Sequence, residues 1–117
     1  TVLGLGRAGR LRLLAVTSPK RAVAMPDIPT VDESGVPGFE VTNWFGAVAP
    51  PATQRVLIDR LNSEIRQALA VNDIRARLAA EGSEVVATSP DAFRDFIRND
   101  VEKWAKVVKA AGIRIDP

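Results

Sequence analysis

The sequence of 117 residues predicts an α/β fold, in which strands alternate with helices along the chain. Two apolar, strand-like runs, residues 11–17 and 39–48, are joined by a long loop rich in proline. The second half of the chain contains three helical segments, and a third strand-like run, residues 83–87, separates the last two of them. The predicted order is a helix end, strand, loop, strand, helix, helix, strand and helix.

The first predicted strand follows a short helical segment. Residues 1–8 have the apolar pattern of the last turns of a helix, and Gly9 occupies the position of a C-cap glycine. Residues 11–17 (LRLLAVT) form an apolar run with one internal arginine, which is typical of a strand buried on both faces. Residues 18–29 contain three prolines and no periodicity, so they are predicted to form a loop.

A capping box precedes the second predicted strand. Thr30 and Glu33 have its spacing, in which the threonine hydroxyl caps the first turn and the glutamate reaches back to the threonine amide. Gly35 is expected to end this turn. Residues 39–48 (FEVTNWFGAV) begin with period-two alternation and then become apolar, so they are predicted to form a strand that bends at Gly46.

Three helices are predicted in the second half of the chain, with N-caps at Thr53, Asn72 and Ser89. The last helix carries a long apolar stripe, which we expect to be buried in the core. Replacing Trp104 on this stripe with alanine would cost about 3–5 kcal/mol if the indole were fully buried. The stripe comprises Phe93, Phe96, Ile97, Val101, Trp104, Val107, Val108 and Ala111.

The composition excludes several classes of function. The net charge is only +2 and the basic residues are scattered among acidic ones, so no nucleic-acid partner is expected. The chain has no cysteine, histidine or tyrosine, which removes thiolate nucleophiles, zinc–thiolate sites and the commonest general base. We therefore expect a binding scaffold, with no enzymatic activity, catalytic residue, metal site or cofactor.

Two short segments are candidates for ligand binding. Thr17 and Ser18 follow the first predicted strand at its carboxyl end, where open α/β sheets bind ligands, although a simple Ser-Pro turn is the alternative. Trp44 and Phe45 face opposite sides of a strand, so one of them can form a cleft wall. Gly46 would then act as a hinge. The alternative is that both aromatic rings belong to the core.

Other motifs carry weaker signals. Residues 4–9 (GLGRAG) match a dinucleotide-binding pattern by letters, but they follow no predicted strand and open no helix. Lys20 and Arg21 can attract an anion, although a solvated loop pair is the simpler interpretation. Asp32 and Glu33 are adjacent carboxylates, but the capping box already uses Glu33.

Nearly the whole chain, in order and without large gaps, closely resembles a known family, the Bug-type solute receptors of tripartite tricarboxylate transporters. The segments that carry this resemblance are LRLLAVTSPKR, MPDIPTVDESGVPGFEVTNWFGAVAPP, VLIDRLNSEIRQALA, IRARLAAEG and DAFRDFIRNDVEKWAKVVKAAGI. The resemblance implies a two-lobed, type II periplasmic binding protein fold. It also implies capture of small carboxylates or related metabolites between the lobes and delivery to the membrane permease subunits of the transporter.

The resemblance further implies a domain organisation and a location. Residues 1–38 would form the end of one lobe and a crossover loop, and residues 39–117 would form part of the other lobe. The glycine-rich loops of the family's N-terminal half have no counterpart here, so we expect an incomplete receptor fold from the periplasm. The alternative is a small α/β interaction domain without a ligand, which self-associates through its sheet edge and apolar helix faces.

Overall fold

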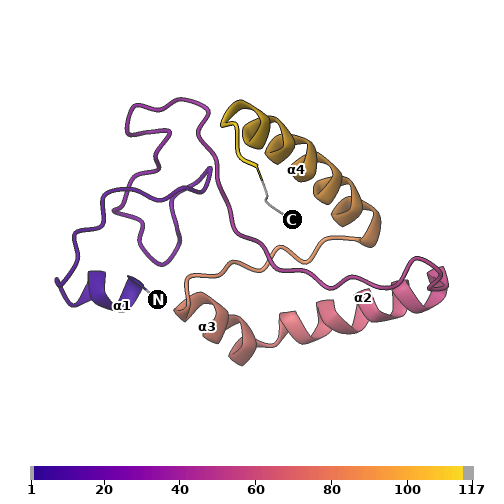
Figure 1. Cartoon of the computed structure of the whole chain (residues 1–117). Coiled ribbons are helices and arrows are strands. Elements are labelled where there is room, and N and C mark those ends of the chain that lie inside the picture. The colour runs from indigo at the N-terminus through magenta and orange to yellow at the C-terminus, as the bar shows by residue number, and fades with distance from the viewer. Residues whose placement is uncertain (1, 115–117) are drawn as a thin grey trace.

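The computed structural model describes residues 2–114, and the ends of the predicted ranges, residues 1 and 115–117, lie outside this part. Turns and extended segments connect four helices in the described part. The helices are α1 (Val2–Arg7), α2 (Arg55–Ala70), α3 (Asn72–Ala80) and α4 (Pro90–Ala110). Figure 1 shows α2 and α4 diverging from one another, with the N-terminal coil on the opposite side of the molecule from the start of α2.

The helices agree with the sequence prediction, but the strands differ from it. Among residues 2–114 the structure has one isolated parallel bridge, between Val16 and Thr30, and no longer strand pairing. Residues 39–48 and 83–87 run as coil and not as strands (Figure 1), and Ala87 has a left-handed φ of 41°, which ends any extended run there. A buried-type strand needs a continuous ladder of hydrogen bonds, and the described residues supply only isolated bonds at Val16 and Thr17.

The predicted helix caps are only partly correct. Ser89 is the N-cap of α4, where its Oγ accepts a hydrogen bond from Ala92 N at 3.2 Å. Thr53 was predicted as the cap of α2, but Gln54 holds that position without a side-chain hydrogen bond. Asn72 is the first residue of α3 and not its cap.

The boundary between α2 and α3 explains the error at Asn72. Val71 has an extended backbone, with φ −66° and ψ 127°, and it serves both as the C-cap of α2 and as the N-cap of α3. A single extended residue therefore separates the two helices. An asparagine one position later lies inside the helix, where its side chain cannot cap the first turn.

The predicted capping box is confirmed in the N-terminal coil. Thr30 N donates to Glu33 Oε2 at 2.8 Å, and Glu33 N donates to Thr30 Oγ1 at 3.0 Å. The same carboxylate accepts from Arg21 Nε at 2.9 Å, and the Thr30 amide and then Arg21 lower the pKa of Glu33. The box closes a turn and not an α-helix. Arg21 and Glu33 are thus bonded to each other and hold the loop together.

Polar contacts join α2 to the start of α4. Arg55 donates from both terminal nitrogens to Asp91, at 3.1 and 2.8 Å, and from Nε to Asp59 at 2.8 Å. Bidentate pairing of this kind is directional, and Arg55 lowers the pKa of Asp91. Asn62 Nδ2 donates to Thr88 O at 2.9 Å and ties the middle of α2 to the segment that precedes α4.

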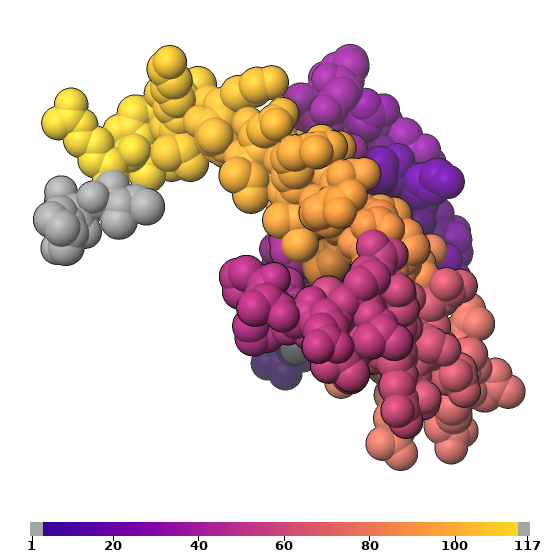
Figure 2. Space-filling view, turned by 90° about the vertical axis from the view of Figure 1, so that its right-hand side faces the viewer, coloured from indigo at the N-terminus to yellow at the C-terminus, as the bar shows by residue number. Residues whose placement is uncertain are grey.

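The apolar stripe of α4 is not buried as the sequence predicted. Trp104 is 38% exposed, and no large side chain is fully buried within the described part of the chain. Figure 2 shows the C-terminal end of α4 projecting from the rest of the molecule. A stripe becomes core only where another surface covers it fully, and at this end of the helix Trp104, Val107 and Val108 remain 38–44% exposed. No described helix is long and apolar enough to span a bilayer.

Candidate functional site

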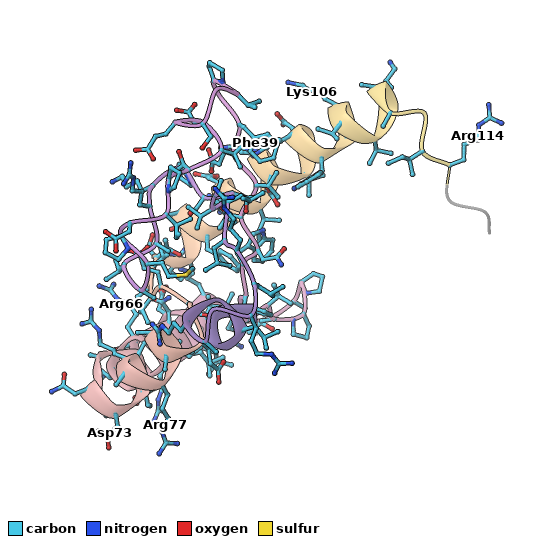
Figure 3. The ribbon with its side chains drawn as sticks, turned by 90° about the vertical axis from the view of Figure 1, so that its left-hand side faces the viewer. Phe39, Arg66, Asp73, Arg77, Lys106 and Arg114 are labelled. Atoms are coloured by element: carbon cyan, nitrogen blue, oxygen red, sulfur yellow. The ribbon has the colours of Figure 1, made fainter. Side chains whose placement is uncertain are left out.

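The candidate site is built on residues 40–46, which run beside α4 in the opposite direction and which we call the connector. At one end, Lys103 Nζ donates to Glu40 O at 2.6 Å. Further along, Trp44 Nε1 donates to Asp100 Oδ2 at 3.0 Å. Figure 3 shows the preceding residue, Phe39, beside the same helix. The connector is extended backbone whose position depends on contacts with α4.

The two aromatic residues of the connector have different surroundings. Trp44 packs edge-on against Phe93 and Phe96, with ring centroids 5.5 Å apart in both pairs and interplanar angles of 85° and 83°. Edge-to-face geometry places the positive ring edge of one partner against the negative face of the other. Trp44 is 38% exposed, whereas Phe45 is 92% exposed. The two side chains therefore differ as neighbours on an extended segment should: one is packed and one is free.

Glycine is required at position 46 because the Phe93 ring lies against its backbone. A Cβ atom added at this position would lie 2.7 Å from Phe93 Cε1 and would overlap Phe93 Cζ. The φ of Gly46 is not in the left-handed region, so space and not backbone conformation demands glycine here. The sequence predicted a hinge at this residue, and the structure adds a packing reason for the glycine.

We expect Gly46→Ala to destabilise the chain by about 1–3 kcal/mol, because the new methyl group must displace the Phe93 ring. Chemical denaturation followed by circular dichroism measures the change. Gly4→Ala is the matched control, since nothing lies within 4 Å of a Cβ atom there and alanine favours the α1 helix. Phe93→Leu should partly restore the stability of Gly46→Ala. Equal stabilities for the Gly46 and Gly4 variants would contradict the close approach.

Thr17 and Ser18 are tied into local backbone structure. Thr17 O accepts a hydrogen bond from Val41 N at 2.9 Å, which joins the end of the first predicted strand to the connector. The Ser18 hydroxyl donates to Lys20 O at 2.7 Å, as expected for a Ser-Pro turn. Trp44 follows Val41 by three residues, about 10 Å of extended chain. The Val41–Thr17 hydrogen bond therefore links the two predicted ligand-binding segments, but it does not place Thr17 against Trp44.

Two depressions formed by the described residues are not lined by any of the predicted site residues. Both are shallow and open and involve α2, and the second also involves α3 and the coil that precedes α4. One is lined by Asp59, Asn62, Ser63, Arg66, Gln67 and Ala70, and the other by Arg66, Leu69, Ala70, Arg75, Val85 and Ala87. Within residues 2–114, no group of acidic side chains is arranged to hold a metal ion.

Sequence reasoning missed Asp100 and Lys103, which bond the connector to α4. The signal was present in the sequence. Both residues lie at helical spacing from Phe93 and Phe96, so they interrupt the apolar stripe on its own face. Polar side chains at such positions indicate specific partners, because an apolar residue would suffice for packing alone.

Sequence comparison identifies the family. A profile described as "Tripartite tricarboxylate transporter family receptor" matches residues 2–113. A protein encoded in the tcbD–tcbE intergenic region of a Pseudomonas sp. is 38% identical over 102 residues, which are 86% of this chain and 30% of that protein. Protein BugT of Bordetella pertussis is 37% identical over 109 residues, which are 93% of this chain and 33% of BugT. The chain spans about a third of the length of these relatives.

Solved structures agree with the sequence relatives. The periplasmic binding protein BugD matches 97% of this chain with a TM-score of 0.83 and 34% identity, and the match covers 39% of BugD. An R. palustris protein solved with adipate matches 96% of this chain with a TM-score of 0.80 and 34% identity, over 38% of its own length. These neighbours confirm the predicted α/β class, because the chain shares the backbone of part of a periplasmic binding protein. The chain belongs to the tripartite tricarboxylate transporter receptor family.

Proposed function

We propose that this chain forms part of an extracytoplasmic solute-binding receptor, which captures a small carboxylate for a tripartite tricarboxylate transporter. The observation that carries the proposal is the likeness to the R. palustris protein, whose structure contains a dicarboxylate, adipate. That likeness extends over 96% of this chain at 34% identity. The family is one of binding receptors, and the proposed role accordingly involves no chemical conversion.

The proposed organisation assigns residues 1–38 to the end of one lobe and the crossover loop, and residues 39–117 to the other lobe. Hydrogen bonds within each part support the division, and the bond from Val41 N to Thr17 O joins the two parts. Val16 bonds to Pro29 and Val31 inside the N-terminal part. The connector, in contrast, bonds to α4 through Glu40 and Trp44. The likeness to periplasmic binding proteins supports the periplasm as the location and the transporter's membrane permease subunits as partners.

The proposed site combines the end of the N-terminal part with the connector. The Thr17 hydroxyl can donate a hydrogen bond to a carboxylate, and the Ser18 hydroxyl can do so once it releases Lys20 O. Phe45 forms an aromatic wall, Trp44 packs behind it on α4, and Gly46 marks the boundary where the lobes move. The Thr17–Val41 hydrogen bond supports this grouping because it links the two segments directly. A ligand between the lobes would also contact residues beyond the part of the fold that this chain represents.

A second candidate function is a small interaction domain that acts without a ligand. The exposed apolar residues of α2 and α4 favour it, since Leu57, Leu61 and Val101 are each more than half exposed. Such faces on a free chain attract a second copy or another protein.

The test compares the chain alone with a chimera in which residues 2–113 replace the matching part of the R. palustris protein. Both are titrated with a carboxylate panel that includes adipate, and the unmodified R. palustris protein is the control. Trp104 and the indoles of the partner sequence are replaced by phenylalanine, so that Trp44 alone reports binding. We expect the chimera to bind one carboxylate and to shift the Trp44 emission. The chain alone should bind weakly or not at all. Tight binding by the chain alone, or none by a folded chimera, contradicts the proposal.

A further inference from the structure

One face of α4 meets the connector through two apolar residues followed by two polar ones. Phe93, Phe96, Asp100 and Lys103 follow one another at intervals of three, four and three residues. At about 100° per residue, these positions fall within a strip about 80° wide along the helix. All four contact the connector: the phenylalanines hold Trp44 and Gly46, Asp100 bonds Trp44, and Lys103 bonds Glu40.

Asp100 and Lys103, the polar residues of this strip, form directional hydrogen bonds, which the apolar residues cannot form. Ring packing between Trp44 and the phenylalanines tolerates sliding, because apolar contact is not directional. The bonds from Trp44 Nε1 to Asp100 and from Lys103 to Glu40 O, at 3.0 and 2.6 Å, each include a charged group and have strict geometry. They join the connector to α4 at two points four residues apart. A one-residue slip would break both bonds and exchange the facing of Trp44 and Phe45.

We infer that Asp100 and Lys103 are positioning residues, which fix the register of the connector on α4. This register keeps Trp44 packed as an anchor and presents Phe45 outward as the aromatic wall of the solute site. The exposed fractions of the two side chains, 38% and 92%, follow from this arrangement. The part of the inference that concerns the solute rests on the proposed function, whereas the register itself does not.

The register is tested on the chain alone through the indole N–H of Trp44. In a Trp104→Phe background, this proton gives a single indole signal in a nitrogen–proton correlation spectrum. We expect Asp100→Ala to move the signal and to accelerate its exchange with solvent at least about fivefold, because the acceptor is lost. Asp100→Asn keeps an acceptor oxygen and should largely retain the slow exchange. Glu102→Gln, on another face of α4, should have no effect.

Lys103→Met gives a second, independent variant that keeps the aliphatic stem and removes the donor. Circular dichroism confirms that α4 still forms in each variant. Unchanged exchange of the Trp44 indole proton in Asp100→Ala would overturn the inference. The inference would also be overturned if the exchange rate rose as much in Glu102→Gln as in Asp100→Ala, because both substitutions would then be loosening the whole helix.

The positioning role is tested in the chimera described above. We expect Asp100→Ala and Lys103→Met each to raise the Kd for the bound carboxylate about tenfold, while Tm changes little. A merely structural pair of bonds would lower Tm and leave Kd unchanged in the folded protein, which would overturn the role. If the unsubstituted chimera binds no carboxylate, the proposed function fails. The indole measurement on the chain alone still decides the register in that case.

Discussion

Replacing Trp44 with alanine should lower the free energy of unfolding by about 2–3 kcal/mol, one of the largest losses expected for any side chain here. The substitution removes two edge-to-face contacts, with Phe93 and Phe96, and a hydrogen bond to Asp100. It also leaves the Asp100 carboxylate without its indole partner. Urea denaturation, with linear extrapolation to water, measures the loss.

Trp104 provides a matched control for this prediction. It has the same exposed fraction as Trp44, 38%, and lies on the same helix as the Trp44 partners. Within the described residues no aromatic ring pairs with it, and α4 projects from the rest of the molecule at this end. We expect Trp104→Ala to lower the free energy of unfolding by about 1 kcal/mol or less. This value revises the larger loss that the sequence predicts for a fully buried Trp104. Equal losses for the two variants would mean that the ring packing around Trp44 adds nothing.

The purified chain should self-associate as its concentration rises, because α2 and α4 expose apolar residues that a core would cover. On α2, Leu57 is 51% exposed and Leu61 is 54% exposed. Substituting both with glutamate places two charges on the apolar face and should shift the population towards monomer. Sedimentation velocity over a wide concentration range measures the distribution.

The control for this experiment adds the same charge elsewhere on α2. Ser63→Glu with Gln67→Glu introduces two negative charges on the polar face of the helix, about 120° and 80° around the helix axis from Leu57. This variant should associate as the unsubstituted chain does. A concentration-independent monomer for the unsubstituted chain would contradict the prediction. Equal loss of association in both double variants would assign the effect to net charge.

Hydrogen bonds between residues close in the sequence made part of this fold predictable. The Thr30–Glu33 box formed as predicted because both of its hydrogen bonds lie within four residues. Ser89 caps α4 for the same reason. The family was also readable, since the resemblance lies in residue order along nearly the whole chain, and the profile match to residues 2–113 confirms it.

Contacts between distant segments decided the rest. Asp100 and Lys103 reach the connector across 56 and 63 residues, and no local rule specifies such a pairing. The stripe of α4 was expected to be core along its length, but Phe96, Val101, Trp104, Val107 and Val108 remain 38–63% exposed. Strands 11–17, 39–48 and 83–87 were predicted from apolar pattern, yet strand pairing requires neighbours in register. Sequence alone thus determined the helices, the family and the cap at Ser89, whereas burial, sheet pairing and the facing of Trp44 and Phe45 depended on which surfaces meet in three dimensions.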